Sequence, residues 1–300
     1  MINVYEMVDS NKRRSWAIMV FFVIFIVLVV WLLSFALDYG LGFIGLALIF
    51  SGFLSFVSYW WSDKIILSLS GARPASRQKD FLFYTVTENM ALANHLPMPK
   101  LYVIDQAAPN AFATGRDPQH AVICATQGLI EKLDRSELEA VVAHEFSHIK
   151  NYDTRLMSIV AILVGMIVLL GDFFIRRTFW TGRSRNKQEG AAGAIILLVA
   201  LLVALLSPLI AKIIQLAISR RREFLADASA IMTTRFPDGL IRALEKIASD
   251  KSPLQSANKA TAHLYIVNPF KGKDAKNWMN SLFSTHPPIE ERVKALKGMS

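Results

Sequence analysis

Two long apolar stretches begin near the N-terminus. Residues 16–37 and 39–62 contain no charged side chain over 22 and 24 residues, respectively. A helix rises about 1.5 Å per residue, so each stretch is long enough to cross a hydrocarbon layer about 30 Å thick. A cleaved signal peptide has a shorter apolar region, of about 7 to 15 residues. The pattern therefore predicts a retained transmembrane hairpin over residues 16–62, preceded by an N-terminal tail over residues 1–15.

A second pair of apolar stretches lies in the middle of the chain. Residues 156–175 are interrupted only by Asp172, and residues 190–211 are uncharged. We interpret them as a second hydrophobic hairpin over residues 156–219. The fold class expected from this pattern is a mainly α-helical integral membrane protein with four hydrophobic helices.

Basic residues beside the apolar stretches predict the orientation of the chain in the membrane. Lys12, Arg13 and Arg14 precede the first hairpin, and Lys64 and Arg73 follow it. Their positions favour the cytoplasm for both ends of that hairpin. The connecting loop of the second hairpin is basic too. Either this loop is exported against the charge bias, or the second pair of helices does not fully cross; in both cases the two polar segments of the chain face the cytoplasm.

The two polar segments, residues 63–155 and 220–300, predict the parts of a water-facing catalytic domain. In the first segment, helical spacing over Phe81–Leu96 is followed by short apolar and β-branched runs between turn signals. These runs predict strands at Lys100–Asp105, Ala111–Thr114 and Ala121–Ala125. We therefore expect a small α+β domain with a short antiparallel sheet.

A helix is predicted directly after these strands. Asp134 followed three residues later by Glu137 is typical of a capping box, and the helix should continue through at least Lys150. The sheet therefore comes first and this helix second.

The composition agrees with a membrane protein. Hydrophobic residues make up 53% of the chain and charged residues 19%, against roughly 25% charge in a soluble domain. The net charge is +9, but the basic residues lie near the ends of the apolar stretches, where contact with a lipid bilayer explains them. A nucleic-acid partner is therefore not expected. The single cysteine, Cys124, excludes an internal disulfide and a paired thiolate zinc site.

The predicted helix after the sheet carries two histidines one turn apart. His144 and His148 lie on the same helical face, with Glu145 beside them. Two imidazoles at this spacing can bind one zinc ion, which lowers the pKa of a bound water to about 7. Glu145 would accept a proton from that water and later protonate the leaving amine of a cleaved peptide. The pattern predicts a zinc-dependent hydrolase with one zinc ion per chain.

A third metal ligand should come from elsewhere in the chain, because zinc hydrolases hold the ion with three protein ligands. Glu223 and Asp227 are four residues apart in a predicted helix that opens the second polar segment. Glu223 could bind the zinc ion, and Asp227 could accept a hydrogen bond from the outer nitrogen of a ligand histidine. By spacing alone, however, a carboxylate pair is more often a solvated helix face.

Four motifs resemble those of a known family. They are His-Glu-Phe-Ser-His at 144–148, Ser-Arg-x-Arg-Glu-x-x-Ala-Asp at 219–227, Asn-Ala-Phe-Ala-Thr-Gly at 110–115 and Thr-His-Pro at 285–287. Together with the two hairpins they look like the HtpX membrane metalloproteases, relatives of the CAAX prenyl endopeptidases. The resemblance implies a gluzincin-type zinc endopeptidase of the cell membrane that cleaves misfolded membrane proteins on the cytoplasmic side. It also implies that Glu223 is the third ligand, supported by Asp227.

The resemblance implies roles for three further residues. Asn110 matches a residue that contacts the substrate backbone, His286 matches one that stabilises the oxyanion, and Arg292 matches an arginine near the carboxylate ligand. An edge strand can also pair with an extended peptide. We therefore expect polypeptide substrates to bind along Asn110, Ala111, Phe112, Ala113 and Thr114. Taken alone, Asn110, His286 and Arg292 each have a simpler interpretation, as a turn, loop or solvent-facing residue.

Two other functions fit parts of the pattern. A membrane scaffold could use zinc only to hold its soluble halves together, without turnover. An intramembrane zinc protease would place its two histidines inside a spanning helix, but residues 131–139 are mostly polar just ahead of the histidines. Metal content and chelator-sensitive cleavage distinguish the enzyme from the scaffold.

Overall fold

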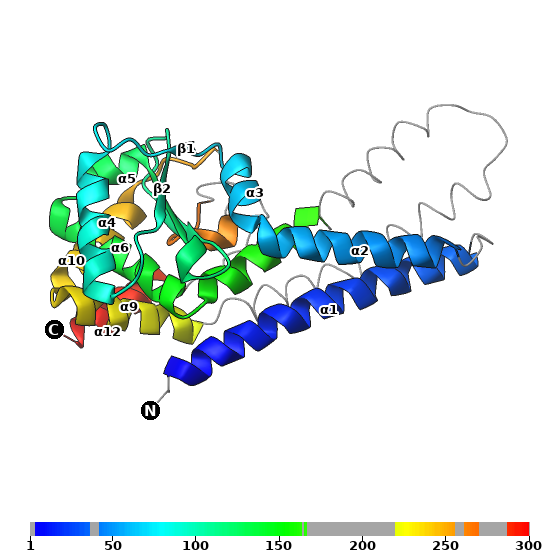
Figure 1. Cartoon of the computed structure of the whole chain (residues 1–300). Coiled ribbons are helices and arrows are strands. Elements are labelled where there is room, and N and C mark those ends of the chain that lie inside the picture. Colours follow the sequence, from blue (N-terminus) through cyan, green and yellow to red (C-terminus); the bar gives the residue numbers. More distant parts are fainter. Residues whose placement is uncertain are drawn as a thin grey trace.

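The structure is a computed structural model, and it describes residues 4–36, 42–163, 165–166, 220–255, 261–269 and 287–299. Figure 1 shows a domain of helices around a small sheet, with a pair of long helices extending away from it. Most of the predicted second hairpin lies outside the described residues, and so does His286. The proposal of four hydrophobic helices therefore stays a prediction.

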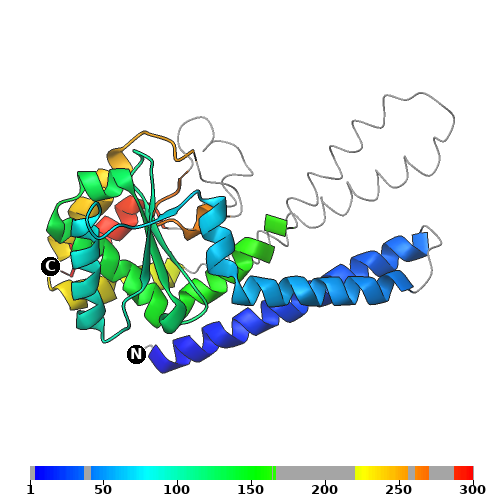
Figure 2. The same cartoon turned by 45° about the horizontal axis from the view of Figure 1, so that its top comes forward.

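The extending arm consists of α1 (Val4–Ala36) and α2 (Gly42–Trp60), which run side by side in opposite directions in both views (Figures 1 and 2). Residues 4–15, at the position of the predicted tail, form the first turns of α1. After α2 the chain bends by 80° into α3 (Ser62–Leu69). Within the described ranges, no helix by itself has the length and apolar character of a membrane span. Ile44–Trp60 and Ser62–Leu69 have that length and apolar character only when they are taken together as a bent pair.

The sheet has four strands in the order β1-β2-β4-β3. Their bounds are β1 (Arg73–Pro74), β2 (Lys100–Ile104), β3 (Ala111–Thr114) and β4 (Val122–Thr126). β3 pairs antiparallel with β4, as expected, but β2 pairs parallel with β4, so the prediction of an antiparallel sheet is wrong for this pair.

The parallel pair arises because the chain between β2 and β3 crosses the end of β4. Gly128, just after β4, donates its N–H to the Gln106 carbonyl at 2.9 Å. A Cβ atom at position 128 would lie 2.0 Å from the Ala107 carbonyl oxygen, so only glycine allows the backbones to approach this closely. The crossing places β3 on the far side of β4 from β2.

Helices cover the sheet. One of them, α6 (Arg135–Lys150), carries the two histidines and is surrounded by the others. Among the described residues, the other helices of this domain include α4 (Phe81–Asn94), α5 (Gln127–Lys132), α9 (Arg220–Thr234), α10 (Pro237–Ser249) and α12 (Ile289–Lys297). α6 contacts α4, α9, α10 and β3, and almost all of its residues from Leu138 to Ile149 are buried. The ligand-bearing helix is thus a core element, and its position is fixed on several sides by packing.

The predicted local signals hold at the helix ends. Asp134 accepts from the Glu137 N–H at 2.9 Å, and the Glu137 carboxylate accepts from the Asp134 N–H at 2.9 Å, which completes the capping box of α6. The helix predicted from Phe81 is α4, which ends at His95 in the left-handed conformation with a φ of 53°.

Candidate metal centre

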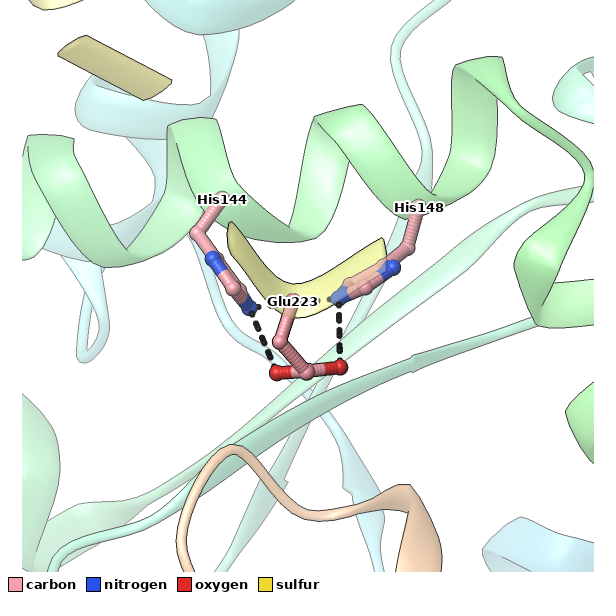
Figure 3. Close-up of side chains that lie close together, drawn as sticks. All are labelled: His144, His148 and Glu223. Atoms are coloured by element: carbon pink, nitrogen blue, oxygen red, sulfur yellow. Dashed lines mark hydrogen bonds and ion pairs between the residues drawn. The ribbon is translucent and has the colours of Figure 1, made fainter. Parts of the chain in front are cut away.

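His144 and His148 face the same point from successive turns of α6. Their Nε2 atoms lie 3.2 Å apart, and both side chains are buried. Glu223, in the first turn of α9, brings its two carboxylate oxygens to 3.7 Å from His144 Nε2 and 3.6 Å from His148 Nε2 (Figure 3). The three residues thus offer ligand atoms that all lie within 4.8 Å of one another.

This arrangement fits a zinc ion better than it fits a hydrogen-bonded cluster. Carboxylates only accept hydrogen bonds, so the Nδ1 atoms of His144 and His148 donate to Asp227 Oδ1 at 2.9 Å and to Asp153 Oδ2 at 3.0 Å. In the neutral imidazoles, both Nε2 atoms then carry lone pairs and point at each other. Two ligands of a tetrahedral zinc ion lie about 3.3 Å apart, close to the observed Nε2 separation.

Asp227 and Arg292 hold the His144 side of the centre. Arg292, on α12, donates two hydrogen bonds to the Asp227 carboxylate, at 2.9 and 2.6 Å. Its NH1 also lies 3.8 Å from a Glu223 oxygen and donates to the Ile266 carbonyl at 3.2 Å. All three charged side chains are buried. One arginine therefore neutralises two buried carboxylates and joins α12 to α9.

The charges in this cluster shift their neighbours' pKa values. Burial raises the pKa of Asp227, but the charge of Arg292 and hydrogen bonds from His144 and Arg292 outweigh it, and the pKa falls below its usual range. Burial lowers the pKa of Arg292, and the charge of Asp227 more than reverses this, so that the pKa is raised. Both side chains are therefore ionised at neutral pH.

Asp153 holds the His148 side of the centre. It lies in the first turn of the helix over residues 153–163, directly after α6 ends. Burial lowers the pKa of His148, but the hydrogen bond to Asp153 and the charges of Glu223, Asp153 and Glu145 raise it to about 9. Because the Asp153 carboxylate accepts a hydrogen bond from Nδ1, Nε2 is the nitrogen left for a metal ion to bind.

Glu145 lies next to His144 in α6 and is 3% exposed. Its charge contributes to raising the pKa values of both His148 and Arg292, which places its carboxylate within electrostatic reach of both sides of the centre. A buried carboxylate beside a metal position is suited to accept and return a proton.

The predicted substrate strand is β3, and part of its outer edge is already paired with the chain itself. Asn110 is buried, donates from Nδ2 to the Val267 carbonyl at 2.9 Å and accepts from the Ala111 N–H at 3.1 Å. The Ile266 N–H donates to the Ala111 carbonyl at 2.9 Å. Asn110 therefore fastens the segment over residues 261–269 to the start of β3.

Three buried residues around the centre were missed from the sequence: Asp153, Asn11 and Arg222. Asp153 follows α6 after a turn and has no helical spacing to His148. Asn11 lies in the stretch predicted as a tail, and Arg222 is the last of three consecutive arginines, with nothing in the sequence to distinguish it from the other two. A polar residue at a position that becomes buried leaves no periodic signal when its partner is distant in the sequence.

Comparisons with known proteins place these observations in a family. A model of peptidase family M48 matches residues 79–300. The protease HtpX homolog of Dictyoglomus turgidum is 45% identical, over 98% of this chain and 94% of the relative. That of Caldanaerobacter subterraneus subsp. tengcongensis is 42% identical, over 99% and 98%. The crystal structure of S. mikatae Ste24p is 21% identical and has a TM-score of 0.42, with 81% of this chain and 58% of that chain covered.

Proposed function

The chain belongs to peptidase family M48 and is a metallopeptidase, and from this we propose that it is a zinc-dependent endopeptidase anchored in the cell membrane. Its substrates would be misfolded or damaged membrane proteins, cleaved on the cytoplasmic side. The single observation that carries the proposal is the convergence of His144, His148 and Glu223 from two helices on one point.

The proposed chemistry divides between the ion and the side chains around it. A zinc ion held by His144, His148 and Glu223 would activate a water molecule and polarise the carbonyl of the scissile peptide bond. Glu145 accepts the proton of the attacking water and delivers it to the leaving amine. Asp227 and Asp153 orient the two imidazoles, and Arg292 neutralises the carboxylates that face it.

Substrate binding is proposed along β3 beyond the residue that the chain itself pairs. The Asn110 carbonyl faces β4, where it accepts from the Thr126 N–H at 2.9 Å, and the Ala111 carbonyl faces outwards. Alternation along an antiparallel strand then directs the N–H and C=O of Ala113 outwards as well. An extended peptide would pair at Ala113. His286, by resemblance to the family, would stabilise the oxyanion.

The membrane anchor is proposed from the arm of α1 and α2. Large apolar side chains are exposed on both helices, among them Trp16, Ile24, Leu46, Ile49 and Phe53. A soluble protein rarely leaves so large an apolar surface in water, and a lipid bilayer would cover it.

The test compares Glu145→Gln with the wild type in the detergent-solubilised full chain. Metal content and cleavage of casein and of an unfolded membrane protein are measured side by side. Glu145→Gln keeps the three proposed ligands, so it should retain zinc and lose cleavage by about 10²- to 10⁴-fold. His148→Ala should lose the metal itself.

Glu139→Gln is the matched control, because it makes the same chemical change on the same helix in a half-buried residue that pairs with Arg135. It should leave both metal content and cleavage unchanged. Cleavage by Glu145→Gln at the wild-type rate would overturn the mechanism, and bound zinc with no wild-type cleavage would support a scaffold instead.

A further inference from the structure

The first helix of the membrane arm reaches the metal centre through one side chain. Asn11, in the third turn of α1, is only 2% exposed although it lies near the start of the chain. Its Nδ2 donates to Asp153 Oδ1 at 2.7 Å and to the Asn151 carbonyl at 2.9 Å. Asn151 lies in the turn that follows the metal-binding end of α6, and Asp153 begins the next helix.

Asp153 relays this contact to a metal ligand. One carboxylate oxygen, Oδ2, accepts from His148 Nδ1 at 3.0 Å, and the other, Oδ1, accepts from Asn11 and from Arg222 NH1, the latter at 3.0 Å. With both oxygens bound from different directions, the carboxylate cannot rotate without losing a hydrogen bond. The imidazole of His148 is therefore held by a group whose own orientation depends on α1 and α9.

An amide suits position 11 for a chemical reason. Its nitrogen supplies two donors, one for Asp153 and one for the Asn151 carbonyl, while its oxygen accepts from Arg222 NH1 at 3.3 Å. Alanine supplies none of these contacts, and aspartate supplies only the acceptor. A buried asparagine that uses both ends of its amide is typical of a fixed junction between elements.

We propose that Asn11 is a positioning residue of the metal centre: through Asp153 it fixes the imidazole of His148, and so it couples the geometry of the metal ligands to the position of α1. This inference rests on the proposed metal site. Its consequence is that a displacement of α1 away from the turn after α6 weakens metal binding and, with it, catalysis.

The experiment measures zinc affinity of the detergent-solubilised full chain by competition with a chromophoric chelator. In the same variants, the absorption spectrum of the cobalt-substituted protein reports ligand geometry. Asn11→Ala should bind zinc about 10- to 100-fold more weakly, the usual effect of removing an outer hydrogen-bond partner of a metal ligand, and should alter the cobalt spectrum.

Ser15→Ala is the matched control. Ser15 lies one turn further along α1, is 1% exposed, and its hydroxyl donates to the Asn11 carbonyl at 2.9 Å within the helix. This variant disturbs the same buried helix face without touching Asp153, so its zinc affinity and cobalt spectrum should match the wild type. Equal values for Asn11→Ala and Ser15→Ala would overturn the proposal, whatever the wild type cleaves.

A double variant tests the route through Asp153. Asp153→Asn should itself weaken zinc binding, and Asn11→Ala should then add little, because the carboxylate on which Asn11 acts is gone. A full independent loss in the double variant would overturn the relay.

A second substitution covers the case in which Asn11→Ala does not fold. Asn11→Asp has nearly the same size and keeps the acceptor for Arg222, but it lacks both donors and sets a carboxylate against Asp153. It should weaken zinc binding by a similar factor, and wild-type affinity would overturn the proposal. A wild-type chain that binds zinc without cleaving would remove the proposed function while leaving this coupling open to the same measurements.

Discussion

The two ends of α6 are built in different ways. At its N-terminal end, Asp134 and Glu137 complete a capping box within one turn, and Arg242 and Lys246 of α10 donate to Glu137 at 3.3 and 2.6 Å. These two cations are half exposed, at 43% and 46%. At the C-terminal end, the partners of the two histidines come from α9 and from the start of the helix that follows α6. These partners are in turn bound by residues of α1 and α12.

The difference shows at which end of α6 charged contacts contribute most to stability. At the capped end the Glu137 carboxylate is buried, but the two cations that neutralise it are half exposed, so solvent partly replaces the contact when one of them is lost. Around the metal centre the carboxylates and the arginine are buried together, and removing one charge leaves another without compensation in a medium of low dielectric constant. Equal chemical changes should therefore have unequal effects at the two ends.

The largest difference is expected from Arg292→Met. The variant removes a buried guanidinium and leaves the buried carboxylates of Asp227 and Glu223 without the cation that neutralises them. The free energy of unfolding should therefore fall by about 3 to 5 kcal/mol. Urea unfolding followed by tryptophan fluorescence in detergent measures this change. Zinc affinity should fall as well, because Asp227 would no longer be held against His144.

The double variant Asp227→Asn, Arg292→Met serves as the control for charge. It removes both members of the pair and should be more stable than Arg292→Met alone, since no buried carboxylate is left at position 227. If Arg292→Met costs less than about 1 kcal/mol, the comparison between the two ends fails.

A smaller effect is expected at the capped end. Asp134→Ala removes the side chain that accepts from the Glu137 N–H, and the loss of such a cap costs about 1 kcal/mol of the free energy of unfolding. Zinc affinity should stay at the wild-type value, because the ligands lie more than two turns further along α6. A fall in zinc affinity comparable to that of Arg292→Met would contradict the separation of the two ends.

Acid should reduce the effect of Asp134→Ala. Hydrogen bonds from the Glu137 N–H and the Ser136 hydroxyl hold the pKa of Asp134 below its usual range. A carboxyl with a lowered pKa in the folded state stabilises the fold above its unfolded pKa, about 4, and loses that contribution as the pH falls through the folded value. The stability difference between wild type and Asp134→Ala should therefore be constant at neutral pH and shrink below about pH 4.

The same contrast explains what could be predicted from the sequence. The capping box, the one-turn spacing of His144 and His148, and the strand Ala111–Thr114 depend on neighbours in the chain, and such patterns have a readable period. Glu223 needed both its spacing to Asp227 and the resemblance to a family, because a carboxylate pair alone is ordinary.

The remaining features depend on residues that are remote in the chain. Asn11 and Asp153 are 142 positions apart, and nothing in either stretch indicates the hydrogen bond between them. The parallel pairing of β2 with β4 follows from the path of the connection past Gly128, a contact that appears only once the strands are in place. Tertiary contacts of this kind decide strand order and buried polar pairs, and they leave no local pattern.

The smallest effect is expected from Glu139→Gln, which tests the capped half of α6 at its surface. Arg135 Nε and Glu139 Oε1 are 3.0 Å apart in an i, i+4 pair, with the arginine side chain 59% exposed. The basic residue precedes the acidic one, which is the weaker order in a helix, so the free energy of unfolding should fall by no more than about 0.3 kcal/mol. The change should vanish in high salt, where exposed charges are screened. The same substitution six residues further on, at the buried Glu145, is expected to lower cleavage by orders of magnitude. A loss above about 1 kcal/mol at Glu139 would therefore contradict the expectation that an exposed ion pair on α6 contributes little to stability.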